Sequence, residues 1–268
     1  MEWKRWKNFY FKIISDFGYD PEKDYQSALI LNNLLKIRKN SKKINTLKHI
    51  IRDRIVFIFG CGPSLPYHLE LLKSSNLNLK NYIYIAADGA TTALMKYDIL
   101  PDIVVTDLDG QISDQIQANK EGTLVIIHAH GDNINQIQQF YSNFEGDIMG
   151  STQNKPLSHI FNFGGFTDGD RCVFLATELK ASIIILLGFD FGNVIGKFSK
   201  PFLVNDEVAN DLKIKKLDWA QKLLSELSNT TRSLIIKVDS KKPELGKIQT
   251  IEFEELVKYL NNKEQDRN

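Results

Sequence analysis

Cysteine is scarce in this chain: Cys61 and Cys172 are the only two among 268 residues. Two cysteines cannot build the disulfide framework of a small secreted domain, and they are too few for a cysteine-rich zinc site. A reducing compartment is the simpler setting for such a chain. The composition therefore excludes a disulfide scaffold, and we expect a cytoplasmic protein.

Long apolar runs are also missing. Runs such as residues 82–87 and 183–187 are far shorter than the roughly 20 residues that a membrane-spanning helix needs. The N-terminus carries Lys4, Arg5 and Lys7, but no continuous apolar segment follows them. This start does not have the pattern of a signal peptide, and we expect no membrane partner.

A strong net charge is absent as well, since the formal net charge is +1 at pH 7. The charge is uneven: residues 1–52 hold 12 Lys and Arg against 5 Asp and Glu, which gives +7 and leaves −6 for the remainder. A basic segment can bind nucleic acid or an acidic partner, but it is more often a solvated helix face. We therefore expect no nucleic-acid partner.

What the chain does have is the composition of a globular protein, with 43% hydrophobic and 25% charged residues. From residue 54 to residue 238, apolar runs that suit buried strands alternate with helical segments, and residues 234–238 form the last predicted strand. This order predicts an α/β fold with a Rossmann-like, mostly parallel sheet and helices on both faces. Apolar stripes at helical spacing predict three helices before it, so we divide the chain into an N-terminal helical appendage (residues 1–52) and an α/β catalytic domain (residues 53–268).

Acidic residues follow two of the predicted strands. Asp88 follows the apolar run 82–87, and Asp107 and Asp109 follow the run 103–105. Side chains two residues apart on a strand point the same way, so Asp107 and Asp109 converge if the strand continues through Asp109. Crowded carboxylates repel, so one is protonated or a cation lies between them. We expect a cation, and oxygen-only ligands favour Mg²⁺; the alternative is that these aspartates are loop residues that cap helices.

A glycine turn follows the first predicted strand. Gly60, Gly62 and Ser64 lie between the apolar run 55–59 and a predicted helix. A strand, a glycine turn and a helix present backbone N–H groups to an anion, so these three residues are candidates for binding phosphate. The same pattern occurs in dinucleotide-binding and S-adenosylmethionine-binding folds, and a plain tight turn is a further alternative.

Histidines and an arginine stand at other predicted strand and helix ends. His128 and His130 follow the run 124–127 and could be metal ligands, proton-transfer groups or phosphate donors. Either could instead be a structural side chain satisfied within the fold. Arg171 lies at the start of a predicted helix, where its charge is unfavourable for the helix dipole unless an anion is near. We therefore count it as a phosphate candidate; the alternative is that it pairs with the acids around it.

A second glycine turn, residues 164–169, precedes that helix, which Asp168 or Asp170 can cap. Asp190 follows the run 182–187 and is another acid at a strand end. Residues 192–201 are predicted to form a basic loop that could close over a nucleotide or simply connect two elements. In parallel sheets ligands bind beyond the carboxyl ends of the strands. Glycine turns, carboxylates, histidines and an arginine at those ends fit the transfer of a phosphate-containing group better than hydride or methyl transfer.

These motifs together resemble the archaeal 6-hydroxymethyl-7,8-dihydropterin pyrophosphokinase family, over roughly residues 54–201. The segments that carry the resemblance are Gly60–Ser64, Ala87–Gly89, Leu100–Gly110, His128–Asn133, Gly164–Arg171 and Gly188–Asp190. The acidic pair of segments is also similar to thiamin pyrophosphokinases, which have a serine where this chain has Gly110. That difference argues against thiamin as the substrate.

The resemblance implies an enzyme that uses ATP as co-substrate and Mg²⁺ as cofactor. It would transfer pyrophosphate to the hydroxymethyl group of a pterin and release AMP, in tetrahydrofolate- or methanopterin-type biosynthesis. The expected small-molecule partners are ATP and the pterin, and association into a homo-oligomer is left open. The hypothesis sorts the candidate residues into three groups, with Asp88 as a third metal ligand or a contact to the pterin. The catalytic and metal-binding residues are Asp88, Asp107 and Asp109; the residues for ATP and phosphate are Gly60, Gly62, Ser64, His128, His130 and Arg171; the pterin-binding residues are Thr167, Asp168 and Asp190.

Two other functions are compatible with the same residues. Asp107-Leu108-Asp109 is a D-x-D motif, which in glycosyltransferase-like enzymes holds a metal on a nucleotide-sugar. The glycine turn at Gly60 would also suit a non-catalytic module that binds S-adenosylmethionine or a nucleotide. Binding of ATP with Mg²⁺, detected as a rise in melting temperature, would favour the pyrophosphokinase hypothesis.

Overall fold

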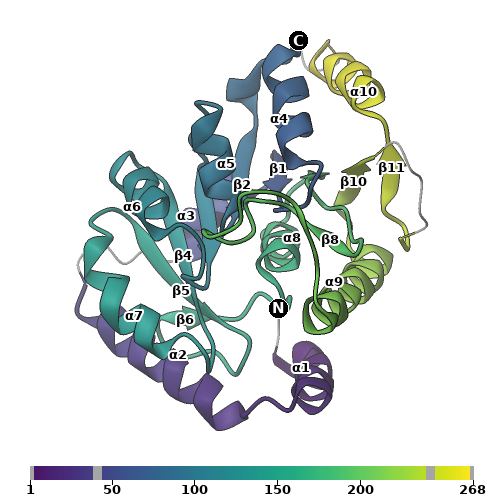
Figure 1. Ribbon diagram of the computed structural model, residues 1–268. Coiled ribbons are helices and arrows are strands. Elements are labelled where there is room, and N and C mark those ends of the chain that lie inside the picture. The colour runs from purple at the N-terminus through teal and green to yellow at the C-terminus, as the bar shows by residue number, and fades with distance from the viewer. Residues whose placement is uncertain (1–2, 39–43, 240–244, 266–268) are drawn as a thin grey trace.

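Figure 1 shows the protein as a computed structural model, which describes residues 3–38, 44–239 and 245–265. Its centre is a nine-stranded sheet with the strand order β11-β10-β7-β1-β2-β3-β4-β5-β6, and every pair of neighbours runs parallel. The predicted Rossmann-like α/β fold is confirmed. The strands are β1 (Ile55–Phe59), β2 (Ile83–Ala87), β3 (Ile103–Thr106), β4 (Leu124–Ala129), β5 (Ile148–Thr152), β6 (Ile160–Phe161), β7 (Ile183–Leu187), β10 (Leu234–Val238) and β11 (Gln249–Ile251).

The central strands are apolar at every position because both faces of the sheet are covered. In β1, Val56 and Ile58 pack into the core on one face. Ile55, Phe57 and Phe59 pack into the core on the other face. Alternate residues of a strand point to opposite faces, so an uninterrupted apolar run is what two covering layers require.

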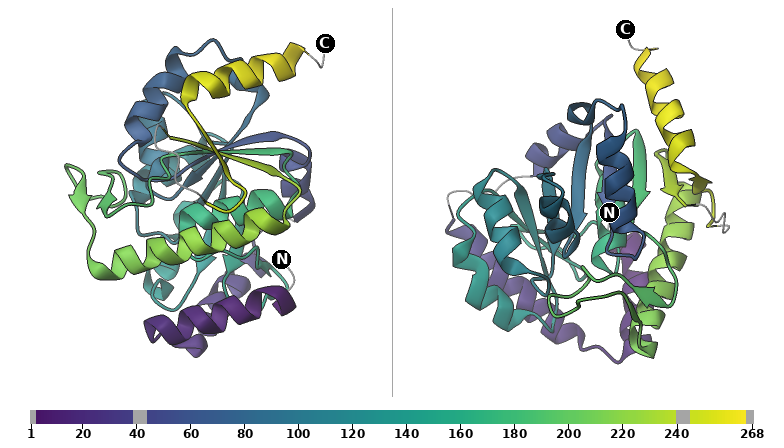
Figure 2. Two further views of the ribbon diagram at one scale, coloured as in Figure 1. Left: turned by 90° about the vertical axis from the view of Figure 1, so that its right-hand side faces the viewer. Right: turned by 45° about the horizontal axis from the view of Figure 1, so that its top comes forward.

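Helices form those two layers, as Figure 2 shows for α9 and α10 on opposite sides of the sheet. One layer contains α1 (Trp3–Phe17), α3 (Ile44–Ile51), α8 (Asp168–Glu178) and α9 (Asp211–Thr230). The other contains α2 (Pro21–Lys36), α4 (Leu65–Ser74), α5 (Ala90–Lys96), α6 (Ile112–Lys120), α7 (Ile134–Phe140) and α10 (Phe253–Gln265). Two short 3₁₀ turns, η1 (Leu79–Asn81) and η2 (Tyr141–Asn143), complete the described helical elements.

The three helices expected near the N-terminus are confirmed, and they pack into both cores. Trp6 of α1 is fully buried, meets the ring of Phe174 in α8 at a centroid distance of 5.9 Å and donates a hydrogen bond to the backbone of Gln153. Leu31 and Leu35 of α2 are buried in the opposite core. The N-terminal segment therefore contributes to both layers, and its separation from the rest at residue 52 stays a prediction.

Two parts of the chain differ from expectation. A strand, β11, follows β10, so residues 234–238 are not the last strand; with only three residues, one of them glutamine, β11 gives little apolar signal. The segment after β7, expected to be a loop, contains the antiparallel pair β8 (Val194–Ile195) and β9 (Glu207–Val208). It runs across the carboxyl ends of the strands (Figure 1), where Phe198 lies against Gly89.

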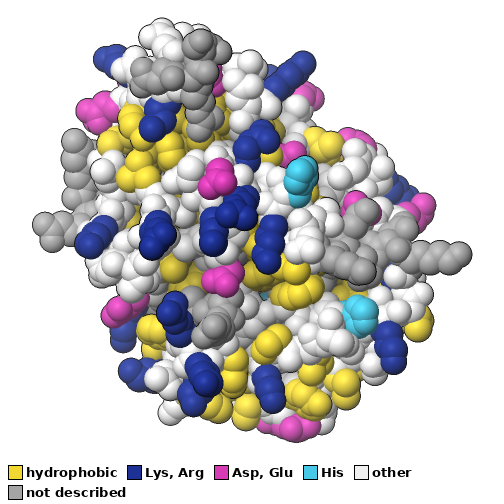
Figure 3. Space-filling view, turned by 180° about the vertical axis from the view of Figure 1, so that it is seen from behind, with side chains coloured by type: hydrophobic (Ala, Val, Ile, Leu, Met, Phe, Trp, Pro, Cys, Tyr) yellow, Lys and Arg dark blue, Asp and Glu magenta, His cyan; other side chains and the backbone are white. Residues whose placement is uncertain are grey.

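One face of the molecule bears many basic side chains (Figure 3). On the face behind the view of Figure 1, Lys and Arg side chains are distributed among polar and hydrophobic ones (Figure 3). Within the described residues, no helix combines the length and the apolar character needed to cross a membrane.

Candidate active site

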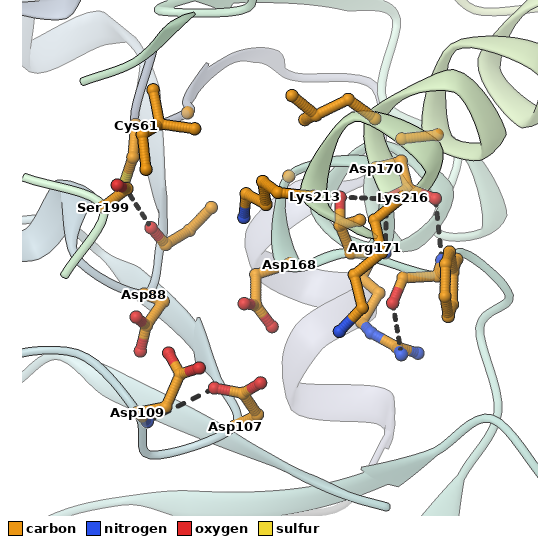
Figure 4. A pocket seen from close by; sticks show the side chains of 18 of the residues that line it. Cys61, Asp88, Asp107, Asp109, Asp168, Asp170, Arg171, Ser199, Lys213 and Lys216 are labelled. Atoms are coloured by element: carbon orange, nitrogen blue, oxygen red, sulfur yellow. Dashed lines mark hydrogen bonds between the residues drawn. The ribbon is translucent and has the colours of Figure 1, made fainter. Parts of the chain in front are cut away.

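A cavity of about 270 Å³ opens at the carboxyl ends of the strands. Its walls come from the turns after β1, β2, β3, β4 and β7, from the start of α8, from one face of α9 and from the α1–α2 connection. This is the position at which parallel sheets bind ligands. Most of the polar residues singled out in the sequence line this cavity, whereas Ser64 and His128 do not. Figure 4 shows part of its lining.

Asp88, Asp107 and Asp109 come together on one side of this cavity. One carboxylate oxygen of each lies within 4.8 Å of the others. The predicted convergence is confirmed, but the reason given for it is wrong. The strand β3 ends at Thr106, and Leu108 adopts φ +67°, so a turn rather than an extended strand brings the carboxylates together.

Asp88 is held rigidly at the end of β2. It is 4% exposed, and its Oδ1 accepts hydrogen bonds from the hydroxyl of Thr106 (2.6 Å) and from Nε2 of Gln115 (2.8 Å). Burial, together with the charges of Asp107 and Asp109, raises the pKa of Asp88 to about 7. A carboxylate with two acidic neighbours and little water is costly to ionise unless a cation is close.

The other two acids have basic partners. Oδ2 of Asp107 lies 3.3 Å from Nε2 of His130, and Asp109 forms an ion pair with Lys200 of the segment that crosses the strand ends. Burial alone would raise the pKa of Asp107, but the hydrogen bond and charge of His130 and the charge of Lys200 lower it below its usual value. Three converging carboxylates, with one pKa raised and one lowered, are a donor set that fits a hard divalent cation such as Mg²⁺.

The glycine turn after β1 uses its donors within the protein. The backbone N–H groups of Gly60 and Gly62 donate to the carbonyls of residues 187 and 188 at the end of β7, both at 2.9 Å. The backbone N–H and the hydroxyl of Ser64 donate to Oδ2 of Asp190, at 3.2 and 2.9 Å. The expected N–H groups that face an anion are therefore already engaged, and these bonds argue against the predicted phosphate contacts, which stay untested.

Asp190 thus lies where the sequence suggested that a phosphate would bind, at the start of α4. A Cβ atom on Gly62 would come within 1.9 Å of its Oδ2, so a glycine is needed for this carboxylate to approach. The other oxygen, Oδ1, has no hydrogen-bond partner among the described residues. Asp190 lines the cavity and keeps one acceptor for a ligand.

The two histidines, His128 and His130, differ in whether they reach the cavity. His130 lines the cavity beside Asp107. His128 is 1% exposed, its Nδ1 lies 3.0 Å from the hydroxyl of Ser151, and its Nε2 has no partner among the described residues. Burial, with the nearby charges of Arg171 and His130, lowers the pKa of His128 well below its usual value. His128 is therefore a neutral side chain behind the cavity wall and does not reach the cavity directly.

Arg171 lines the cavity, but its guanidinium is occupied. It donates to the backbone carbonyls of Gly165 (3.1 Å) and Phe166 (2.6 Å) and to Oε1 of Gln153 (3.0 Å). Arg171 forms no ion pair within 4 Å with an acid among the described residues. Its hydrogen bonds to protein oxygens explain its position without a bound anion. Arg171 holds the second glycine turn in place.

The start of α8 differs from the prediction in its cap. Thr167, rather than Asp168 or Asp170, is the N-cap residue, and its hydroxyl and backbone N–H both donate to Asp170 in a capping box. Asp168 is the first residue of the helix and faces the cavity, without a hydrogen bond among the described residues. Burial and the charges of Asp107, Asp88 and Asp109 raise the pKa of Asp168 well above its usual value.

Sequence reasoning missed the residues that the α1–α2 connection and α9 bring to the cavity. Tyr19 lines it from the α1–α2 connection, Asp24 from the first turn of α2, and Lys213 and Lys216 from α9. Asp24 is 3% exposed and accepts hydrogen bonds from Tyr10, Gln153 and the backbone of Gly131. Its position on the apolar face of α2, four residues before Ala28, was a signal of a buried polar role. The lysines gave none, because charged residues on a helix are usually solvated.

Comparison with known proteins relates the sequence of this chain to one family. The model of the family described as 6-hydroxymethylpterin diphosphokinase MptE-like matches residues 29–196. A 6-hydroxymethyl-7,8-dihydropterin pyrophosphokinase of Methanocaldococcus jannaschii is 44% identical over 236 residues, which cover 85% of this chain and 97% of that protein. One of the same name from Pyrococcus furiosus is 44% identical over 237 residues, which cover 88% of this chain and 99% of that protein.

Solved structures resemble the chain only in fold. A MAf glycosyltransferase from Magnetospirillum magneticum AMB-1 superposes with a TM-score of 0.50 at 16% sequence identity, over 75% of this chain and 34% of that one. At that identity the likeness supports the Rossmann-like architecture and says nothing of the reaction. It therefore gives no separate weight to a glycosyltransferase function.

Proposed function

This chain belongs to the 6-hydroxymethylpterin diphosphokinase MptE-like family, and on that basis we propose that it transfers the pyrophosphoryl group of ATP to 6-hydroxymethyl-7,8-dihydropterin. In this reaction the hydroxymethyl oxygen forms a bond to the β-phosphorus of ATP. The bond from that phosphorus to the oxygen bridging to the α-phosphate breaks, AMP leaves with the bridging oxygen, and the hydroxyl proton is released. The product is a pterin diphosphate, an intermediate suited to tetrahydrofolate- or methanopterin-type biosynthesis.

The observation that carries the proposal is the meeting of Asp88, Asp107 and Asp109 at the cavity. These residues would hold Mg²⁺, which when bound neutralises charge on the phosphates of ATP. His130 fixes the orientation of Asp107, and Thr106 and Gln115 fix that of Asp88. The chain therefore contributes by positioning, since carboxylates held in one arrangement lose little entropy when a ligand binds.

The pterin is assigned to the carboxylates that the fold leaves with free acceptor atoms. The amino-pyrimidine edge of a pterin carries two parallel N–H donors, and a carboxylate with both oxygens free accepts both. Asp168 has both oxygens without a partner among the described residues and Asp190 keeps one, so we assign the amino-pyrimidine edge to these two acids. Thr167 commits its hydroxyl to Asp170 and shapes the turn.

The assignment of His130 and Arg171 to the phosphates remains part of the proposal, because both line the cavity. His128 would act on them only through its neighbours, since it is buried behind the wall. The glycine turn at Gly60 and Gly62 would contribute shape rather than donors, because its N–H groups bond to β7.

The test is product analysis. The protein is incubated with Mg²⁺, ATP and 6-hydroxymethyl-7,8-dihydropterin, and nucleotides are separated by anion-exchange chromatography. AMP formed in equal amount to the pterin diphosphate is the expected result. ADP as the product would indicate ordinary phosphoryl transfer. In a parallel incubation with a nucleotide-sugar, release of a nucleoside mono- or diphosphate, with ATP unchanged in the first incubation, would contradict the proposal.

A further inference from the structure

The first turns of α9 carry lysines on the face that meets the cavity. Lys213, Lys216, Leu217 and Ala220 all line it, at the spacing of a single helix face. Asn210 fixes this face, because its side chain caps α9 and accepts a hydrogen bond from the backbone N–H of Lys213 at 2.8 Å. The register of α9, set by its cap, therefore determines which of its lysines reach the cavity.

These two lysines differ from the exposed Lys23 in their burial, and from Lys200 and Arg171 in their lack of hydrogen-bond partners in the described part of the chain, although all of these residues line the cavity. Lys213 and Lys216 are half-buried, and neither side chain has a hydrogen bond or an ion pair among the described residues; Lys216 lies 5.9 Å from the centre of the Tyr19 ring. By contrast, Lys200 is paired with Asp109, and Arg171 is bonded to backbone carbonyls. A half-buried ammonium without an acidic partner retains its capacity to bind an anion.

The lysines and the acidic group lie on opposite sides of the cavity. Figure 4 shows Lys213 and Lys216 on α9, across from Asp88, Asp107 and Asp109. A ligand between these two sides must offer a cation to one and an anion to the other. A polyphosphate that carries a divalent cation has this pair of charges, whereas an uncharged sugar does not.

We propose that Lys213 and Lys216 bind the triphosphate of the nucleotide, on the side of the cavity opposite the metal-binding carboxylates. This assignment rests on the proposed function for the identity of the nucleotide. It places the phosphate-binding donors on α9 rather than on the glycine turn after β1, whose N–H groups bond to the end of β7. Lysine suits the position, because its three donors can follow phosphate oxygens in several geometries.

The experiment measures binding of two probes, ATP with Mg²⁺ and inorganic tripolyphosphate with Mg²⁺, by isothermal titration calorimetry. The variants are Lys213→Met, Lys216→Met and Lys213→Arg, with Lys222→Met as the matched control. Lys222 is an exposed lysine of the same helix that packs over the ring of Trp219 and does not line the cavity. Circular dichroism and melting temperature verify that each variant folds.

We expect each Lys→Met variant to raise the Kd of both probes by at least about tenfold, the loss expected for one hydrogen bond to a charged group. Lys213→Arg keeps the charge and should recover most of the affinity, and Lys222→Met should match the wild type. The KM for ATP should rise with the Kd, while the KM for the pterin stays within about twofold. Unchanged affinity for both probes in both Lys→Met variants would overturn the assignment.

The outcomes separate this assignment from the proposed function. If lysine-dependent binding of ATP is found but no AMP forms with the pterin, the reaction is wrong and the phosphate assignment stands. If the wild type forms AMP and the Lys→Met variants keep its KM for ATP, the phosphate assignment is wrong and the reaction stands. Failure of the wild type to bind either probe would overturn both.

Discussion

Two regions at the carboxyl ends of the strands differ in whether their polar groups are paired within the protein. At the ends of β1 and β7, the donors of Gly60, Gly62 and Ser64 bond to residues 187–190. At the ends of β2 and β3, Asp88, Asp107 and Asp109 crowd together. In the first region these donors have hydrogen-bond acceptors within the protein. In the second region like charges lie close together, which lowers the stability of the fold. Polar groups that the fold leaves in conflict are the better candidates for binding a ligand.

The largest effect should follow from a change in the crowded region. We expect Asp107→Asn to lower turnover by about 1,000-fold, because it removes a charged ligand of the expected metal while keeping the shape of the side chain. The rate of AMP formation is the measurement. The control Asp132→Asn lies at the cavity but outside the acidic cluster, and its turnover should stay within about threefold of the wild type. Near-normal turnover in Asp107→Asn would contradict a role of the crowded carboxylates in the reaction.

A substitution in the glycine turn after β1 should mainly lower the stability of the protein. In Gly62→Ala the new methyl group would lie 1.9 Å from Oδ2 of Asp190 and 2.7 Å from the carbonyl of Gly188. We expect the free energy of unfolding to fall by about 2–3 kcal/mol, as for other overpacked sites, measured by urea titration. Gly192→Ala is the matched control, since a Cβ there meets no atom within 4 Å; equal stability of the two variants would contradict this view of the turn.

Removal of one crowded charge should stabilise the metal-free protein. The pKa of Asp88 is raised from 3.8 to about 7, so the folded state holds this proton more tightly than the unfolded chain does. The stability due to the proton is fully present below pH 4 and is lost as the pH rises through 7. In EDTA we therefore expect Asp88→Asn to melt about 5 °C above the wild type at pH 8.

The pH dependence separates this cause from better packing. The difference in Tm between Asp88→Asn and the wild type should be larger at pH 8 than at pH 5, because only the ionised carboxylate is destabilising. Asp114→Asn, at a half-buried position in the first turn of α6 and outside the acidic cluster, is the control for a general effect of charge removal. A difference in Tm that does not change with pH would refute the electrostatic explanation.

The smallest effect is expected at Ser64. Its hydroxyl bonds to Asp190, while the backbone N–H of Ser64 makes a second bond to the same oxygen and remains in the variant. Ser64→Ala should lower the free energy of unfolding by about 1 kcal/mol. It should leave the KM for ATP within about twofold of the wild type; a tenfold rise in that KM would show that the turn binds phosphate after all and would remove the contrast between the regions.

The sequence predicted the fold well because its strands are short apolar runs in a regular order. An uninterrupted apolar run indicates a strand that is buried on both faces. It also predicted the meeting of Asp88, Asp107 and Asp109, since strand ends of a parallel sheet share an edge. The three-residue strand β11 was missed, because it is too short to show a period. The fold therefore followed from local patterns, and the errors lie where those patterns are weak.

The use of individual donors could not be predicted, because it depends on residues far apart in the chain. Ser64 and Asp190 are 126 residues apart, and Arg171 and Gln153 are 18 apart. No local pattern reveals that such groups satisfy each other. The same limit explains the missed lysines of α9, which reach the cavity only because that helix packs beside the strand ends.

The most direct test of the central claim is the binding of a divalent cation by the crowded carboxylates. Mn²⁺ is titrated into the protein in the presence of a non-hydrolysable ATP analogue, and free Mn²⁺ is counted by electron paramagnetic resonance. We predict at least one bound ion per chain in the wild type, and its loss in a variant with both Asp107→Asn and Asp109→Asn. Equal binding of Mn²⁺ by the wild type and this variant would contradict the account.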